Sequence, residues 1–333
     1  MRIKIGVLGG GSWGTTLANM LAEKQDLEVE LWVREPDLVD EIKEKRENSW
    51  YLPGIRLNDN LKVSSDLKEV VRYKDYYLVV VPTQFIRQTL TQVKDLFPMS
   101  PTIICASKGI EIASLSPLSK VIEESLAEKK PVYAILSGPS FAKEVSLKLP
   151  TAVSLGCANE QIGKRIQRIF SNNYFRVYYN SDYLGVELGG ALKNVMALAA
   201  GIADGLGFGH DARAALITRG LAEMSRLGVA LGARERTFMG LSGMGDLVLT
   251  CTGDLSRNRQ VGLRLGKGEK LKEIIDSMRM VAEGVKTTEA VYKLAQKIGV
   301  DLPITSQVYA ILYEGKDPRE AVSKLMQREL KEE

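Results

Sequence analysis

A chain of 333 residues exceeds what one hydrophobic core usually organises and is long enough for two domains. Hydrophobic residues make up 45% and charged residues 26% of the sequence, which are ordinary values for a soluble globular protein. The net charge of +4 is small, and basic and acidic residues are interspersed. A nucleic-acid-binding protein more often carries a one-sided basic stripe, so we expect a small-molecule substrate and no nucleic acid.

The cysteine and histidine content restricts the chemistry further. Cys105, Cys157 and Cys251 lie far apart and form no C-x-x-C pair. The first apolar stretch is too short for a signal peptide, so we expect reduced thiols and a cytoplasmic protein. His210 is the single histidine, which excludes a three-histidine zinc site, and we expect no metal. We interpret His210 as a loop or helix-capping residue.

The first half of the chain alternates short β-branched runs with amphipathic helical stretches. This alternation predicts a parallel sheet with helices on both faces, a Rossmann-like doubly wound α/β domain. The expected helices include Thr15–Glu23, Pro36–Arg46 and Leu115–Glu128. The expected strands are Ile3–Leu8, Glu28–Val33, Leu78–Val81, Thr102–Ala106, Val132–Leu136 and Thr151–Leu155.

The pattern changes after residue 182. From Tyr183 onward the apolar residues recur at helical spacing and no strand is predicted. We therefore expect a dinucleotide-binding domain at residues 1–182 and an all-α substrate-binding and catalytic domain at 183–333. Leu188–Leu206 is apolar but interrupted by polar residues, which predicts a buried core helix and no membrane span. The later helices are expected at Ala214–Leu227, Leu271–Val281, Thr287–Ile298 and Ser306–Leu312.

A G-x-G-x-x-G pattern at Gly9, Gly11 and Gly14 follows the first expected strand and opens the first expected helix. In a dinucleotide site the first glycine allows the tight turn and the second lets the backbone approach a pyrophosphate. The third lets helix and strand pack closely. The anion then lies on the exposed N–H groups of the helix N-terminus. The alternative is a glycine-rich turn that binds nothing, but the strand–turn–helix context favours the dinucleotide site.

Arg34 stands about 20 residues after the turn, where NAD-specific sites usually carry an acid for the ribose hydroxyls. A guanidinium suits a 2′-phosphate, so NADP(H) is the preferred cofactor. Glu35 could still serve a ribose, which keeps NAD(H) as the second cofactor, and a solvated surface arginine is the remaining interpretation.

Five further motifs make the interpretation more specific. They are ASKGIE (106–111), LSGPSFAKE (136–144), GGALKNV (189–195), LSGMGDL (241–247) and LSRNR (255–259). Together with GGGSWGT at residues 9–15, these motifs follow in order across nearly the whole chain, which resembles the bacterial-type NAD(P)-dependent glycerol-3-phosphate dehydrogenases. The resemblance implies reversible hydride transfer between NAD(P)H and dihydroxyacetone phosphate, giving sn-glycerol 3-phosphate for glycerophospholipid synthesis.

Lys193 is the candidate catalytic residue. It sits in a stretch otherwise made mainly of glycine and apolar residues, where desolvation lowers the pKa of an ammonium group toward acid–base work. A lysine beside a carbonyl can protonate the developing alkoxide, and its neutral form can take the proton back. A lysine snorkelling from a helix edge is the structural alternative. The resemblance implies that Lys193 is the proton acceptor.

Asp246 could orient Lys193 or accept a hydrogen bond from a substrate hydroxyl, and it could also be an ordinary helix N-cap. Ser256, Arg257 and Asn258 combine a hydroxyl, a guanidinium and a carboxamide near a predicted helix start, which suits a phosphate dianion. A capped helix with an exposed arginine is the alternative. By resemblance, the substrate phosphate binds here.

The resemblance also implies contacts from the ends of the strands in the first domain. Lys108, Gly138 and Ser140 follow two of these strands and are expected to bind substrate, together with Lys193, Asp246 and the Ser256–Asn258 group. The cofactor contacts are expected from Gly9, Gly11, Ser12, Trp13, Gly14, Arg34, Lys108, Ala142, Arg257, Val281 and Glu283.

Two other functions remain as alternatives. A related β-hydroxyacid dehydrogenase would share the two-domain build and the lysine but would recognise a carboxylate. A catalytically silent NADP(H)-binding sensor would have no use for Lys108, Lys193 and Asp246 together. The sequence leaves open whether the protein is a homodimer.

Overall fold

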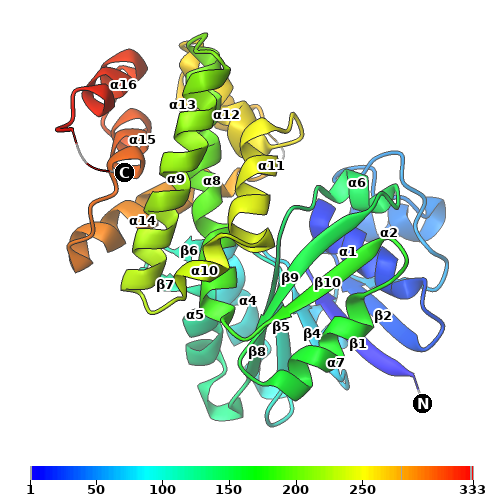
Figure 1. The fold of residues 1–333 in the computed structure, drawn as a ribbon. Helices are drawn as coiled ribbons and strands as arrows, with labels where there is room; N and C mark the ends of the chain where they lie inside the picture. The colour runs from blue at the N-terminus through cyan, green and yellow to red at the C-terminus, as the bar shows by residue number, and fades with distance from the viewer. Residues whose placement is uncertain (1, 279, 331, 333) are drawn as a thin grey trace. The chain divides into compact units, whose positions relative to one another are not determined.

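The computed structural model describes residues 2–278, 280–330 and 332. The chain forms two compact units (Figure 1). The first combines Met1–Lys108 with Pro117–Glu187, and the second combines Gly109–Ser116 with Leu188–Glu333. The division lies five residues beyond the boundary expected at residue 182, because the first turn of the long helix still packs in the first unit, where Val186 joins a hydrophobic core.

The first unit is built on an eight-stranded sheet in the order β10-β9-β8-β5-β4-β1-β2-β3. Chain order runs outward in one direction from β1 to β3 and in the other from β4, which is a doubly wound arrangement. The strands are β1 (Ile3–Leu8), β2 (Leu27–Trp32), β3 (Lys62–Ser64), β4 (Tyr76–Val79), β5 (Thr102–Cys105), β8 (Val132–Ser137), β9 (Thr151–Cys157) and β10 (Phe175–Asn180).

The expectation of a parallel sheet is wrong at one place, because β8 and β9 pair antiparallel, whereas the other recorded pairs of the eight-stranded sheet are parallel. The connection between them carries the short helix α6 (Ala142–Ser146), which packs on α1 (Ser12–Ala22). Thr16 bonds to Ser146 Oγ at 2.9 Å and to the Ala142 carbonyl at 3.3 Å. The chain is thereby held at the carboxyl edge and re-enters the sheet from that edge.

The two faces of the sheet bury separate cores, because successive side chains of a strand point to opposite sides. Ile5 and Val7 of β1 join one core, whereas Leu8 joins the other. The first core takes the apolar sides of α1, α2 (Pro36–Lys45) and α7 (Glu160–Phe170). The second takes α3 (Leu67–Val71), α4 (Ile86–Thr91) and α5 (Leu118–Ser125). Helices on both faces confirm the predicted fold class.

Neither edge strand of the sheet, β3 or β10, was predicted. Strand β10 is the longer of the two. Its Phe175 and Val177 are buried and its Arg176 and Tyr178 are exposed, the alternation of a strand with one solvated side. It lies at the edge of the sheet, where Gln167 Nε2 donates to the Val177 carbonyl at 2.8 Å. The mixed polarity of this segment concealed it in the sequence.

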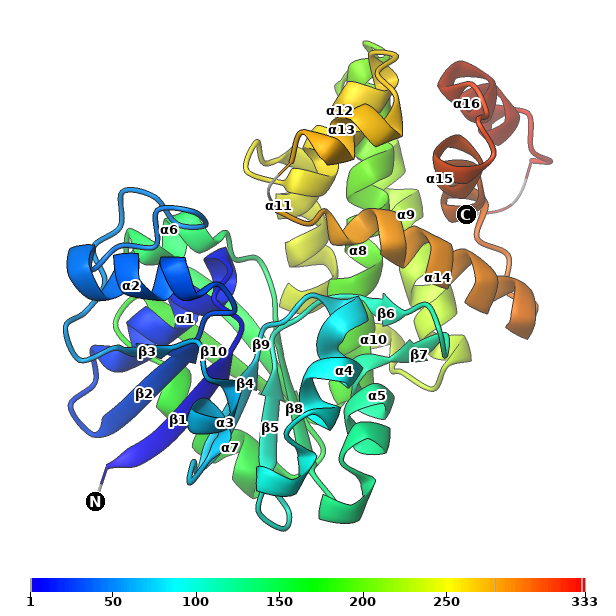
Figure 2. The same ribbon diagram turned by 180° about the vertical axis from the view of Figure 1, so that it is seen from behind.

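The second unit is helical, and its described residues after 182 contain no strand, as expected. α8 and α9 run side by side in both views (Figures 1 and 2). α8 is long and apolar enough to cross a membrane by composition alone, but its apolar window is fully buried, which confirms the core-helix prediction. A two-stranded sheet pairs β6 (Ile110–Glu111) with β7 (Ser116–Pro117). The helices are α8 (Tyr183–Gly205), α9 (His210–Ala230), α10 (Glu235–Phe238), α11 (Asp246–Thr252), α12 (Arg257–Gly266), α13 (Leu271–Asp276), α14 (Glu283–Ile298), α15 (Pro303–Tyr313) and α16 (Pro318–Met326).

One predicted helix is too long. The helix expected over 271–281 ends at Asp276, and residue 279 lies outside the described residues. Val281 therefore lies in the segment before α14, with its side chain exposed. The segment is apolar enough to predict a longer helix, but within α13 only Ile274 is buried, so this helix has little packing to extend it.

Candidate active site

The glycine-rich turn joins the end of β1 to the start of α1. Gly9 has φ +123°, and a Cβ there would lie 2.7 Å from the Val80 carbonyl oxygen. A Cβ on Gly14 would collide with the Gly9 carbonyl, so this glycine permits the close packing of helix and strand. A Cβ on Gly11 would meet nothing within 4 Å. The turn is therefore closed on the protein side and open at the glycine expected to face a pyrophosphate.

This turn occupies the topological switch point of the sheet. β1 pairs with β2 on one side and β4 on the other, so the strand order reverses beside the carboxyl end of β1. The first N–H groups of α1 have no preceding helical carbonyl and carry the positive end of the helix dipole. The donor set and the open space at Gly11 fit the diphosphate of a dinucleotide.

Ser12 and Trp13 are the first two residues of α1. The Ser12 hydroxyl donates to the Tyr51 carbonyl, so it holds a neighbouring loop against the turn. The ring centroids of Trp13 and Phe175 lie 6.4 Å apart. The Trp13 Nε1 is buried and has no hydrogen-bond partner among the described residues. The start of α1 is therefore bonded to the loop at Tyr51 and lies near Phe175 of β10.

Arg34 follows β2, and its side chain is 73% exposed. It pairs with Glu35 at 2.8 Å, and the same carboxylate oxygen accepts a hydrogen bond from the Tyr51 hydroxyl at 3.4 Å. Both residues that the sequence offered for the ribose end of the cofactor therefore stand next to each other. The guanidinium remains accessible to a phosphate.

Lys108, Gly138 and Ser140 come together in the first unit. The Lys108 ammonium donates to the Gly138 carbonyl at 3.2 Å, and the Ser140 hydroxyl donates to it at 3.1 Å. Gly138 has φ +147°, and a Cβ there would lie 2.9 Å from Val153 Cα. The described chain contains no cis peptide bond, so Pro139 is trans. Ala142, the first residue of α6, lies beside Thr16 of α1.

In the second unit, Lys193 lies on α8 and only 7% of its surface is exposed. Its Nζ donates to Asp246 Oδ1 at 2.7 Å and to Thr250 Oγ1 at 2.7 Å. Asp246 is the first residue of α11, directly after a π-helical turn at Leu241–Gly245, and only 1% of it is exposed. The snorkelling alternative for Lys193 is thus wrong, because the ammonium group is buried and paired. The carboxylate also stabilises the ammonium form against the cost of burial.

The Ser256–Asn258 group begins α12. The Ser256 hydroxyl caps the helix by accepting from the Arg259 N–H at 3.2 Å, and the exposed Arg257 donates to the Val281 carbonyl at 2.7 Å. The Asn258 carboxamide is engaged at both ends, donating to Asn194 Oδ1 at 3.0 Å and accepting from the Gly284 N–H at 2.9 Å. Asn258 therefore ties α12 to α8 and α14, next to Glu283, the first residue of α14.

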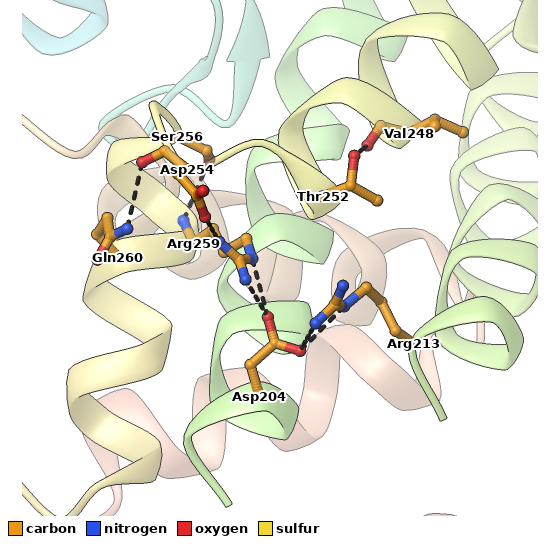
Figure 3. Close-up of polar contacts among 8 residues, drawn as sticks. All are labelled: Asp204, Arg213, Val248, Thr252, Asp254, Ser256, Arg259 and Gln260. Carbon is orange, nitrogen blue, oxygen red and sulfur yellow. Dashed lines mark hydrogen bonds and ion pairs between the residues drawn. The ribbon is translucent and has the colours of Figure 1, made fainter. Parts of the chain in front are cut away.

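A second set of charges anchors the same helix start. Figure 3 shows Asp204 between two guanidinium groups: Arg213 donates to it at 2.9 Å through Nε, and Arg259 at 2.8 Å. Arg259 also pairs with Asp254 at 2.9 Å. Asp204 belongs to α8, which also carries Lys193, and Arg259 belongs to α12. The ion pair between them therefore holds the Ser256–Asn258 group in a fixed position relative to α8.

Two polar residues of this cluster were missed from the sequence. Thr250 follows Asp246 by one helical turn and shares its face of α11, which is a detectable spacing. Asn194 adjoins Lys193 and bonds to Asn258, but nothing in the sequence pairs these two asparagines across 64 residues. His210 is exposed at the start of α9, consistent with its interpretation as a helix-end residue.

Among the described residues there is neither a cluster of candidate metal ligands nor a disulfide. No group of three or more His, Cys, Asp or Glu side chains there could hold a metal ion. Cys105, Cys157 and Cys251 are free and buried. Burial raises the pKa of Cys251 to about 12, so this thiol is not poised as a nucleophile.

A doubly wound sheet with a glycine-rich turn at its switch point, joined to a helical unit, defines a dinucleotide-binding protein of two-domain build. Family models narrow the class. Residues 4–163 match the N-terminal domain of NAD-dependent glycerol-3-phosphate dehydrogenase, and residues 182–323 match its C-terminal domain. The chain belongs to the NAD-dependent glycerol-3-phosphate dehydrogenase family, a family of oxidoreductases.

Relatives and solved structures agree with this membership. A glycerol-3-phosphate dehydrogenase (NAD(P)+) of Maridesulfovibrio salexigens is 61% identical over 331 residues, covering 99% of this chain and 100% of that protein. One from Citrifermentans bemidjiense is 57% identical over 334 residues, covering 100% and 99%. The crystal structure of glycerol-3-phosphate dehydrogenase from Coxiella burnetii superposes with a TM-score of 0.94 at 43% identity, covering 98% and 99% of the two chains.

Proposed function

We propose that this protein is a cytoplasmic NAD(P)-dependent dehydrogenase that interconverts dihydroxyacetone phosphate and sn-glycerol 3-phosphate, and thereby supplies glycerophospholipid synthesis. One observation carries the proposal. Lys193 is a buried ammonium group held between Asp246 and Thr250 at 2.7 Å from each. The chain belongs to a family of glycerol-3-phosphate dehydrogenases. Reduction of a carbonyl to an alcohol needs a proton donor such as this ammonium group.

The first unit would hold the cofactor. The N–H groups at Gly11, Ser12 and Trp13 suit its diphosphate, and Arg34 suits a 2′-phosphate. When bound, the nicotinamide supplies or accepts a hydride at the substrate carbon. Ala142 lies beside α1 and is a further candidate contact.

Lys193 handles the proton at the C2 oxygen. Its ammonium group donates a proton to that oxygen as the carbonyl is reduced, and the neutral amine takes the proton back in the oxidative direction. Asp246 holds Nζ in place and stabilises its charge, and Thr250 fixes the second hydrogen-bond direction. This arrangement needs no metal ion to stabilise the developing oxyanion.

The substrate phosphate is assigned to the start of α12. Ser256 and Arg257 offer a hydroxyl, a guanidinium and the N–H groups of the first helical turn, and Asn258 holds this start against Asn194 and α14. Val281 and Glu283 adjoin Arg257 and complete the proposed cofactor contacts of this unit. Lys108, Gly138 and Ser140 form the proposed substrate contacts of the first unit.

The deciding experiment is an initial-rate panel with the full-length protein. We expect NADPH oxidation with dihydroxyacetone phosphate and little with 2-keto and 3-keto acids of similar size. A preference for keto acids would instead indicate a β-hydroxyacid dehydrogenase. Nucleotide binding without oxidation with any substrate would indicate a silent sensor. Either of these two results contradicts the proposed activity.

The preference for NADP(H) has its own test, because it depends on Arg34. Replacing Arg34 with alanine should raise the KM for NADPH about tenfold, since one charge-assisted phosphate contact is lost, and leave the KM for NADH nearly unchanged. Arg56→Ala is the matched control, because both side chains are 73% exposed and each pairs with one neighbouring acid. Equal losses with both nucleotides would contradict the 2′-phosphate role, and no loss with either would assign Arg34 to the surface alone.

A further inference from the structure

The loop that follows α2 lies against the glycine-rich turn, and Asn48 is its point of contact. Asn48 is completely buried. Its Nδ2 donates to the Gly10 carbonyl at 2.9 Å and to Thr15 Oγ1 at 2.8 Å, and its Oδ1 accepts from the Tyr51 N–H at 3.1 Å. One carboxamide thus joins the turn, the first turn of α1 and the loop at residues 48–54.

The Gly10 carbonyl is held by two donors. Besides Asn48 Nδ2, the Thr15 hydroxyl donates to it at 3.2 Å. The Gly10–Gly11 peptide is planar and trans, so its N–H points opposite to its C=O. Holding the carbonyl toward Asn48 and Thr15 therefore turns the Gly11 N–H away from these two side chains. At Gly11 itself, a Cβ would meet nothing within 4 Å.

The same loop reaches the other residues expected near the cofactor. The Ser12 hydroxyl donates to the Tyr51 carbonyl, and the Tyr51 hydroxyl donates to Glu35 Oε1 at 3.4 Å. The loop is thereby bonded both to the diphosphate end and to the ribose end of the expected nucleotide path. Glycine residues have many accessible backbone conformations, and these hydrogen bonds restrict the turn to one of them.

We propose that Asn48 is a positioning residue for the cofactor: it holds the Gly10–Gly11 peptide with its N–H facing the diphosphate. This inference rests on the proposed function, because it takes the bound group to be a dinucleotide. Asn48 is completely buried and acts through the turn, whereas Arg34 acts through direct contact with the nucleotide. The diphosphate is common to NADPH and NADH, so loss of Asn48 weakens both to the same extent.

The test measures the Kd of NADPH and of NADH by nucleotide fluorescence, with the full-length protein and without substrate. Asn48→Ala should raise both values about tenfold or more, since two hydrogen bonds to the turn are lost, and leave their ratio unchanged. In turnover assays the KM for NADPH should rise by a similar factor while kcat and the KM for dihydroxyacetone phosphate change little. Asn60→Ala, at an exposed asparagine of the same connection, is the control.

Thr15 provides a second route if Asn48→Ala does not fold. Thr15→Val keeps the shape but removes the hydroxyl that binds both Asn48 and the Gly10 carbonyl, whereas Thr15→Ser keeps the hydroxyl. We expect weaker nucleotide binding for the valine variant and near-normal binding for the serine variant. Folded Asn48→Ala or Thr15→Val protein with both Kd values within about twofold of wild type would overturn the proposal. So would a shift confined to NADPH or to the KM for dihydroxyacetone phosphate.

The binding assay also separates the two proposals. If the wild-type protein binds NADPH but does not reduce dihydroxyacetone phosphate, the proposed activity fails, and the role of Asn48 is still decided by the Kd values. If the wild-type protein is active and the Asn48 and Thr15 variants bind nucleotide normally, only the positioning role fails.

Discussion

The glycine-rich turn of the first unit and the lysine cluster of the second (Lys193, Asp246 and Thr250) are assembled over different distances along the chain. Gly9, Gly11 and Gly14 follow one another within a single strand–turn–helix element. Lys193 bonds to Asp246 and Thr250, which are 53 and 57 residues away. The first is built from backbone conformation and the second from side-chain charge.

This difference predicts how the two regions respond to mutation. Changes at the turn alter the direction of N–H groups, so they should appear in nucleotide affinity. Changes in the lysine cluster alter a proton donor and its partners, so they should appear in turnover. The following experiments test whether effects on nucleotide affinity and effects on turnover separate in this way.

The largest effect is expected at Lys193. Lys193→Ala should lower kcat by about 10²–10⁴-fold, because a positioned acid–base group is removed, and leave the Kd of NADPH unchanged. Steady-state NADPH oxidation and nucleotide fluorescence measure the two quantities. Lys297→Ala, at an exposed lysine of α14, is the control. Retention of more than about a tenth of wild-type turnover would contradict the catalytic role.

A smaller loss is expected at Asp246. Asp246→Asn keeps the shape but replaces the charged partner of Lys193, so kcat should fall about 10- to 100-fold, as expected for a hydrogen bond to a charged group. The control is Asp276→Asn, at an exposed residue that ends α13. If the KM for NADPH rose while kcat stayed constant, Asp246 would belong with the nucleotide and not with the lysine.

Thr250 tests whether the second bond to Lys193 matters. Thr250→Val removes a neutral hydrogen-bonding group, so kcat should fall by about 3- to 10-fold, and Thr250→Ser should restore most of it. The comparison is made by kcat at saturating substrate. Equal activity of the valine and serine variants would show that Thr250 fills space in α11 and does not position Nζ.

The smallest effect on activity is expected at Glu223. Substitution there should change the pH dependence of the protein's stability. Burial raises the pKa of Glu223 to about 7, although its carboxylate accepts the N–H groups of Ile304 and Thr305 at the start of α15. The folded state therefore binds this proton more tightly than the unfolded state, whose pKa is near 4.5. The stability that protonation confers is complete below pH 4.5 and is lost as the pH rises through about 7.

Glu223→Gln should flatten that dependence. The glutamine carbonyl can still accept from the start of α15 but does not ionise, so the variant should lose less stability than wild type between pH 5 and pH 8. The difference is at most about 3 kcal/mol. Thermal unfolding midpoints measured across this pH range provide the comparison, with Glu329→Gln, at an exposed residue, as control. Parallel pH profiles for wild type and Glu223→Gln would contradict the assignment.

The described elements show where sequence patterns sufficed. β1 was predicted at its observed bounds, and the remaining predicted strands of the sheet were displaced by no more than two residues at either end. Most residues of these strands are buried, and β4 is a continuous buried run, whereas β1, β2 and β9 carry polar residues between the apolar ones. The edge strand β10 was missed, because its polar alternation reflects a solvated face, and the antiparallel pairing of β9 depends on where α6 packs.

The sequence alone determined the doubly wound first unit, the helical second unit and the family, because periodicity and ordered motifs are local properties of the chain. The tertiary structure decided which side chains meet. It paired Lys193 with Asp246 and Thr250, and it placed Asn48 under the Gly10 carbonyl. Hydrogen-bond partners separated by tens of residues depend on how helices pack, and no local pattern encodes that packing. The glycine-rich turn was visible in six residues, but the group that orients it lies 38 residues away.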